Sequence, residues 1–218
     1  MAGHIRLGWW REQIDAIYAG RAVDTPEGRA LADAMRAYAL PREIFHRALD
    51  ARALDFEETP FADEAAMEAH AVAVSGGITQ LAMQVLGADS RADQAARNAG
   101  IARSYAGHIG SFAAFAQRRR CRAPLQWFEE AGLNAEDVFS ARHLTPELRA
   151  VLDRTGSRAL RALGDLNRAR FPTAVTPALA PATLARWVAR GFDPFAPRAL
   201  PAWQRVARIA WSNLTWRF

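Results

Sequence analysis

Residues 100–117 constrain the fold more than any other stretch, because they carry a single charge, Arg103, and no carboxylate. Glycines stand at 100, 107 and 110, and each costs roughly 1 kcal/mol relative to alanine inside a helix. Most helical stability in proteins comes from packing, so this helix needs close neighbours on most sides. We therefore expect a central buried helix, which either lines a pocket or fills a core. A run of arginines ends it: Arg118, Arg119, Arg120 and Arg122.

The rest of the chain favours helices as well. Half of the residues are hydrophobic, and alanine, the best helix former and a poor strand former, dominates them. No alternation typical of a strand occurs. Helices are expected over about 5–19, 25–38, 41–55, 62–86, 90–117, 125–131, 135–140, 145–168, 182–190 and 202–216. The pattern predicts one all-α bundle over 1–218, with proline-rich connections at 172–201.

Local signals refine two of these helices. Ser75-Gly76-Gly77 interrupts the helix over 62–86 with small, helix-weakening residues, which predicts a kink or a close helix crossing. Ser90 with Asp93 three residues later resembles a capping box and predicts the start of the central helix.

Charge and cysteine content narrow the function classes. The formal charge is +5 and every basic residue other than histidine is arginine, but acids are interleaved with the arginines. This favours a solvated surface over a nucleic-acid site. The single cysteine, Cys121, excludes an internal disulfide. Its arginine neighbours could lower the pKa of its thiol, although a thiol without a chemical role is the simpler interpretation. With no membrane-spanning stretch and no signal-peptide layout, we expect a cytoplasmic protein.

Four blocks in order resemble the squalene/phytoene synthase family. They are IRLGWWRE at 5–12, Leu-Pro-Arg at 40–42 with the polar cluster Asp50, Arg52 and Asp55, VSGGIT at 74–79, and the segment 100–124. The resemblance implies an all-α bundle of the isoprenoid synthase type around a prenyl pocket. The family's first aspartate motif would lie upstream of Trp9, so either Met1 is an internal start and N-terminal helices precede it, or the protein lacks those helices.

The resemblance puts the family's chemistry in doubt. Active members hold Mg²⁺ through two aspartate-rich motifs, and hard Mg²⁺ needs oxygen ligands. In a gapless register, the two metal-binding aspartates of the second motif fall on Ser111 and Phe115, and the preceding arginine and asparagine fall on Gly110 and Gly107. Serine is a weak ligand and phenylalanine is none. No catalytic or metal residue, and no cofactor, is therefore expected.

Loss of these aspartates is shared by a divergent branch of the family, the mitochondrial complex I assembly factors and their bacterial relatives. The resemblance implies a catalytically degenerate binding or assembly factor, whose partner is a protein client or an isoprenoid or other lipid, not nucleic acid. The alternative is an active Mg²⁺-dependent prenyltransferase with relocated ligands such as Asp50, Asp55 or Glu57. A plain lipid carrier is a third hypothesis.

Three sets of residues are candidate sites. His70, Ser104, His108, Ser111 and Phe115 would line the former pocket, or else fill a core. Arg118, Arg119, Arg120 and Arg122 would clamp an anionic headgroup or diphosphate, or else form a solvated helix end. The helix over 202–216 combines tryptophan with arginine, which suits either peripheral contact with the inner membrane face or packing on the bundle.

Overall fold

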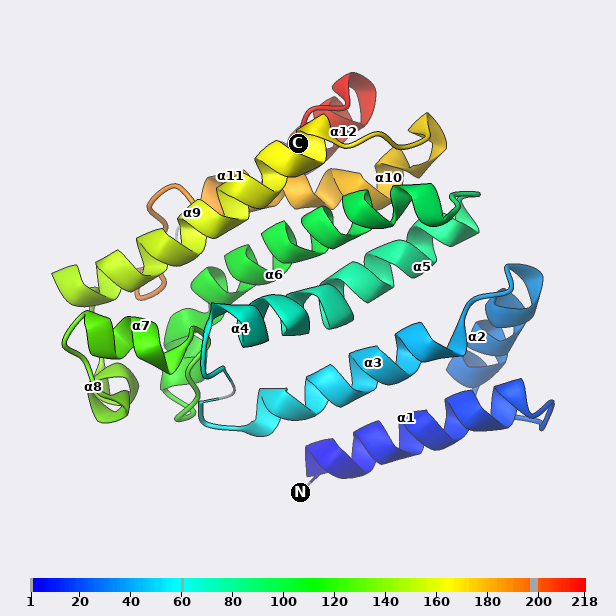
Figure 1. The fold of residues 1–218 in the computed structure, drawn as a ribbon, viewed down its shortest axis with the longest axis horizontal. Coiled ribbons are helices and arrows are strands. Elements are labelled where there is room, and N and C mark those ends of the chain that lie inside the picture. Colours follow the sequence, from blue (N-terminus) through cyan, green and yellow to red (C-terminus); the bar gives the residue numbers. More distant parts are fainter. Residues whose placement is uncertain (1, 60, 197–199) are drawn as a thin grey trace.

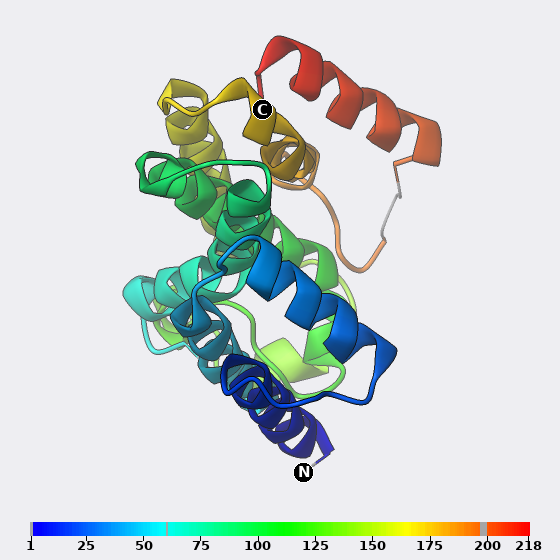
Figure 2. The same cartoon turned by 90° about the vertical axis from the view of Figure 1, so that its right-hand side faces the viewer.

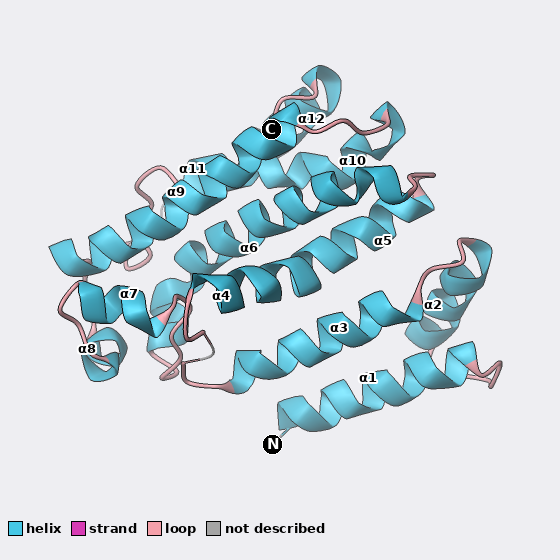
Figure 3. Ribbon diagram, viewed as in Figure 1, coloured by secondary structure: helices cyan, strands magenta, loops and turns pink. Residues whose placement is uncertain are grey.

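The computed structural model describes residues 2–59, 61–196 and 200–218, and within these ranges it contains helices and loops but no strand (Figure 3). The α-helices are α1 (Ala2–Tyr18), α2 (Pro26–Ala37), α3 (Arg42–Ala53), α4 (Glu64–Ala71), α5 (Gly77–Val85), α6 (Asp93–Ala116), α7 (Leu125–Glu130), α8 (Ala135–Ser140), α9 (Pro146–Arg168), α10 (Thr176–Leu179), α11 (Ala185–Val188) and α12 (Ala202–Thr215). The all-α prediction is confirmed.

The long helices lie side by side in the order α1, α3, α4–α5, α6, α9 (Figure 1). Helices α2 and α9 start where proline at the first helical position predicts, and Thr25 and Thr145 each accept a hydrogen bond from a backbone N–H of the first turn. The large core surrounds α6, and a smaller one, including Ile14, Met35 and Leu40, joins α1, α2 and α3. The α1 end and α12 lie at opposite extremes of the molecule (Figure 2).

Helix α6 is largely buried, as expected, but of its three glycines only Gly100 is buried, and Gly107 and Gly110 are exposed. A Cβ added to Gly100 would lie 2.3 Å from the backbone nitrogen of Gly76, so the two helices meet at backbone contact. The partner segment, Val72–Gly76, is a π-helical turn between α4 and α5. The predicted close crossing at 75–77 is therefore confirmed, with a π-bulge as its local cause.

Some predicted boundaries are wrong. Ser90 does not cap α6; Asp89 accepts a hydrogen bond from the Arg91 N–H, a 3-10 turn covers Ser90–Ala92, and α6 begins at Asp93. The expected helix at 182–190 is replaced by the end of a 3-10 turn, Ala180–Leu184, followed by the single turn of α11. Proline at 181, inside the 3-10 turn, removes a backbone donor that a regular helix would use.

Candidate functional site

Asp55 is the centre of an ion network at the arginine end of α6. It lies in the 3-10 turn Leu54–Phe56 after α3. Its Oδ1 accepts hydrogen bonds from Arg122 Nη1 at 2.7 Å and from His70 Nε2 at 2.9 Å, and its Oδ2 pairs with Arg52 Nη1 at 2.8 Å. Arg120 donates to the backbone oxygen of Asp55 at 3.0 Å. One carboxylate thus organises groups from α3, α4 and the loop after α6.

The network is largely buried, and its positive groups keep Asp55 ionised. The Arg122 side chain is only 5% exposed and that of Asp55 14%. Burial alone would raise the pKa of Asp55, but hydrogen bonds from His70 and Arg52 and the charge of Arg122 outweigh it, so this pKa lies well below its usual range. Asp55 is therefore a carboxylate fully committed to protein partners.

His70 connects Asp55 to a second group of buried side chains that carry polar atoms. His70 and His108 face each other with ring centroids 6.1 Å apart, and Phe61 packs against both. His70 Nδ1, His108 Nδ1 and the Tyr105 hydroxyl are buried without a protein hydrogen-bond partner. Burial, the largest cause, and the charge of Arg122 lower the pKa of His108 to about 3, and burial raises the pKa of Tyr105. His108 is accordingly a neutral imidazole at neutral pH.

The positions that the resemblance assigns to metal ligands lie on one side of α6. The Ser111 hydroxyl donates to the backbone oxygen of Gly107 at 2.6 Å. The guanidinium carbon of Arg122 lies 4.0 Å from the centroid of the Phe115 ring, in a cation–π contact. Ser104, one of the predicted pocket residues, is buried in the bundle. An added Cβ at Gly107 or Gly110 would meet no atom within 4 Å, so this side of α6 is open.

The four arginines after α6 lie in different surroundings, and three of them contact different protein partners. Arg119 pairs with Glu136 at 3.0 Å and with Glu58 at 3.6 Å, away from the buried Arg122. Arg120 reaches Asp55 and the Phe56 ring, and Arg118 is exposed. The left-handed backbone at Arg119, with φ of 54°, turns the chain between them and sends the side chains in different directions.

Cys121 between these arginines is buried, and burial raises its thiol pKa to about 11. The suggestion that neighbouring charges lower this pKa is wrong, because desolvation outweighs them. The buried thiol donates to the Ala123 carbonyl, so it behaves as a packed side chain.

An apolar cleft that the sequence analysis missed lies between α1, α2, α3 and the α4–α5 segment. It encloses about 270 Å³, and its lining includes Trp10, Ile14, Phe45, Leu49, Val74 and Ile78. Arg52 is its only charged lining residue among the described part of the chain, and its guanidinium also binds Asp55. None of the five predicted pocket residues lines this cleft, and His70 and Phe115 belong instead to the surroundings of Asp55 and Arg122. The helical spacing of Phe45, Leu49 and Arg52, which puts them on one face of α3, is the sequence feature from which this cleft could have been predicted.

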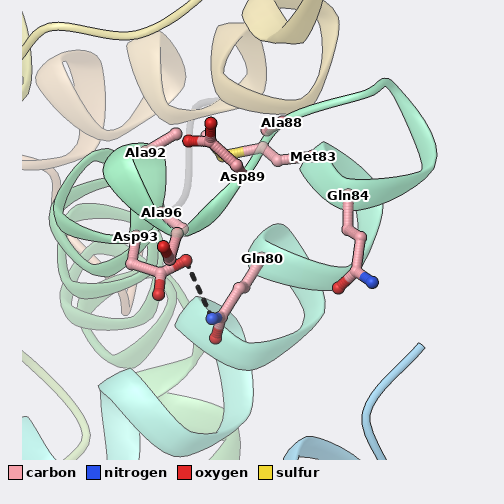
Figure 4. Close-up of a pocket in the computed structure, with 9 residues that line it drawn as sticks. Gln80, Met83, Gln84, Ala88, Asp89, Ala92, Asp93 and Ala96 are labelled. Carbon is pink, nitrogen blue, oxygen red and sulfur yellow. Dashed lines mark hydrogen bonds between the residues drawn. The ribbon is translucent and has the colours of Figure 1, made fainter. Parts of the chain in front are cut away.

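A smaller polar pocket of about 230 Å³ lies where α5 meets the start of α6 (Figure 4). Asp93 accepts a hydrogen bond from Gln80 Nε2 at 2.8 Å across it, and Asp89 pairs with Arg91. It is separate from the apolar cleft and from the Asp55 network, which is the more developed site.

The donor set does not fit a Mg²⁺ ion on a diphosphate. Ser111 and Phe115 offer no carboxylate, Asp55 is held by arginines and His70, and Asp50 is paired with Arg11. Across the residues that the structure describes, no group of three or more His, Cys, Asp and Glu is placed to hold a metal ion.

Comparison with known proteins agrees with the all-α fold and with the family resemblance. A family model described as squalene/phytoene synthase matches residues 1–213. The chain belongs to the squalene/phytoene synthase family. A phytoene synthase from Rhodobacter capsulatus is 27% identical over 161 residues, which is 72% of this chain and 46% of that protein. This family member thus spans about half the length of that curated relative.

A solved structure supports the fold of this family member independently. The crystal structure of squalene synthase HpnC from Alicyclobacillus acidocaldarius superimposes with a TM-score of 0.67 and 20% sequence identity, covering 96% of this chain and 73% of the other. No helix of the described residues is long and apolar enough to cross a membrane.

Proposed function

We propose that this member of the squalene/phytoene synthase family is catalytically degenerate and acts as a binding or assembly factor. The observation that carries the proposal is the identity of the two residues at the assigned metal positions. Ser111 is bonded to its own helix and Phe115 supports the buried Arg122. The nearby, largely buried carboxylate of Asp55 is neutralised by arginine. Such a site lacks the ligands that hold a diphosphate through Mg²⁺.

The apolar cleft supplies a place to bind. Its volume of about 270 Å³ lies just below the roughly 300–1,000 Å³ of ordinary ligand pockets. It therefore suits part of one isoprenoid or acyl chain, or the side chains of a client protein, and not two prenyl chains side by side. Ile78 is 52% exposed at its edge, so the cleft continues into an apolar surface. The resemblance to complex I assembly factors supports a client protein of that kind.

Turnover measurements test the loss of catalysis. The protein is incubated with Mg²⁺ and farnesyl or geranylgeranyl diphosphate, and pyrophosphate and C30 or C40 products are measured. We expect neither to form. Pyrophosphate release with a coupled product would overturn the proposal in favour of an active prenyltransferase. In that case Asp50→Asn, Asp55→Asn and Glu57→Gln variants would show which relocated carboxylate holds the metal.

Ligand binding tests the cleft directly. Lipids extracted from the purified protein are identified by mass spectrometry, and binding of a fluorescent isoprenoid analogue is titrated. Ala48→Phe would fill the cleft and is expected to weaken binding at least about ten-fold. Ala30→Phe adds the same side chain at an exposed position on α2 and is the matched control. Equal affinity in both variants would rule out the cleft as the binding site.

A further inference from the structure

Helix α12 turns its apolar side away from the protein. Trp203, Val206, Trp211 and Leu214 are 69%, 66%, 66% and 78% exposed. At 3.6 residues per turn they fall within an arc of about 140°. The buried residue of α12 is Ser212, on the opposite side. A surface helix normally buries its apolar stripe, so the orientation of α12 is reversed.

The end of the chain fixes this orientation. Phe218 is buried in the core, and Asn167 on α9 both donates to its backbone oxygen, at 3.1 Å, and accepts from its backbone nitrogen, at 2.8 Å. Arg186 on α11 donates to the same oxygen at 2.5 Å. Because Trp216 adopts a left-handed backbone with φ of 56°, the chain turns sharply between α12 and this anchor. Rolling α12 to bury its stripe would extract Phe218.

The surroundings of the stripe are positively charged. In the sequence, no Asp or Glu follows Asp193, whereas four arginines do. A groove of about 740 Å³ runs beside α12, and Trp203 and Trp211 share its lining with Arg186, Arg208 and Arg217. The exposed apolar face therefore adjoins a basic groove.

We propose that α12 docks on an anionic membrane surface, with its apolar stripe in the acyl boundary and the basic groove on the lipid phosphates. This proposal is independent of whether the protein has catalytic activity. Tryptophan at the edge of an apolar helix face and arginine beside it are typical of helices that lie in the interface. Fourteen residues span about 21 Å, which is too short to cross a hydrocarbon core of about 30 Å.

A second copy of the chain is a poorer occupant of this face. A twofold contact through α12 would place the same arginines opposite one another, and the segment after Asp193 offers no carboxylate to neutralise them. Like charges brought together in this way oppose association. An anionic bilayer supplies the missing negative charge.

Vesicle flotation tests the proposal with the full chain. Vesicles of phosphatidylcholine alone are compared with vesicles containing about one third phosphatidylglycerol, at low and high salt. We expect binding to the anionic vesicles only, weakened by salt. Arg208→Glu with Arg217→Glu, both in the basic groove, should reduce binding at least about 25-fold, because each arginine near such a surface contributes roughly five-fold. Arg6→Glu with Arg21→Glu makes the same charge change at exposed positions near α1 and should alter binding far less.

A fluorescent label tests which face inserts. Because the native thiol, Cys121, is buried, an environment-sensitive dye can be attached selectively to Leu214→Cys or, as control, to Ile5→Cys, whose native residue is 67% exposed. We expect a blue shift with anionic vesicles for the label at 214 and none for the label at 5. Leu214→Ser should weaken flotation about ten-fold with an unchanged melting temperature.

Three results would overturn the proposal. They are absence of flotation with anionic vesicles, equal spectral shifts for both labels, and a concentration-dependent dimer that Leu214→Ser dissociates. The last result would assign the face to a second copy of the chain.

Discussion

Replacing Asp55 by asparagine distinguishes a structural carboxylate from a relocated metal ligand. The change keeps the shape and removes the charge that neutralises Arg122, whose side chain is 5% exposed. Removing one partner of a buried ion pair costs about 3–5 kcal/mol. The asparagine oxygen can still accept one hydrogen bond from His70 or Arg52. We therefore expect the free energy of unfolding to fall by about 3 kcal/mol, the lower end of this range. In a domain of this size, that lowers the melting temperature by roughly 6–12 °C.

The control lies on α3, just before the 3-10 turn that carries Asp55. Asp50 pairs with Arg11, but its side chain is 66% exposed. An exposed pair contributes about 0–1 kcal/mol, so Asp50→Asn should change the free energy of unfolding by less than about 1 kcal/mol. Thermal and urea unfolding of both variants are measured in Mg²⁺-free buffer with chelator. If Asp55 were a metal ligand without a structural role, the two variants would be equally stable there and would differ only in their response to Mg²⁺.

The pH dependence provides a second readout of the same variant. Because the pKa of folded Asp55 is lowered, its contribution to stability is complete above the ordinary carboxyl pKa of about 4 and is lost as pH falls below it. The stability difference between the native protein and Asp55→Asn should therefore be constant from pH 8 to pH 5 and shrink at more acidic pH. A difference that grows on acidification would refute the argument. So would a loss for Asp55→Asn no larger than for Asp50→Asn.

Three further predictions concern α6 and the residues around it. Gly100→Ala should destabilise the protein by about 2 kcal/mol or more, because the new Cβ would collide with the backbone of Gly76. Gly107→Ala on the same helix places its Cβ in open space and should stabilise the protein by up to about 1 kcal/mol. The urea concentrations at the unfolding midpoint compare the two variants. The pKa of His108 is about 3 in the folded protein, so on acidification the unfolded chain binds a proton at this residue before the folded protein does. The free energy of unfolding should therefore fall by about 2 kcal/mol between pH 8 and pH 5. Unfolding curves of His108→Phe, measured at both pH values, should lack this decrease. Cys121 should react with a thiol reagent only under unfolding conditions, as followed by mass spectrometry.

Local rules predicted the fold because they act over a few residues. The Thr-Pro-Glu starts at 25 and 145 cap helices through contacts within one turn, and the glycines at 76 and 100 indicate a close crossing because few other residues permit one. The shorter elements after residue 172 were less predictable. There, repeated prolines remove backbone donors, and packing decides between a 3-10 turn and an α-helix.

The site depends on contacts that no spacing rule encodes. Asp55 and Arg122 are 67 positions apart, and nothing in either segment indicates that the arginine run serves this carboxylate instead of a ligand. The apolar cleft joins residues from α1, α2, α3 and α5, so its existence depends on how these helices pack. By contrast, the amphipathic stripe of α12 is visible in the sequence. Its outward direction is not, because that depends on Asn167 and Phe218.

The two proposed binding surfaces lie far enough apart to be used together. The cleft belongs to the α1–α3 end, and α12 lies at the other extreme of the molecule, as both views show (Figures 1 and 2). The core around α6 lies between them, so a bilayer against α12 would leave the mouth of the cleft uncovered. A protein held at the membrane in this way could present the cleft to a client or an apolar chain. Binding to vesicles should therefore leave the affinity of the cleft for an isoprenoid analogue unchanged, and Ala48→Phe should leave vesicle binding unchanged. If filling the cleft released the protein from vesicles, the cleft and α12 would form one binding surface, and the separation argued from their positions would be wrong.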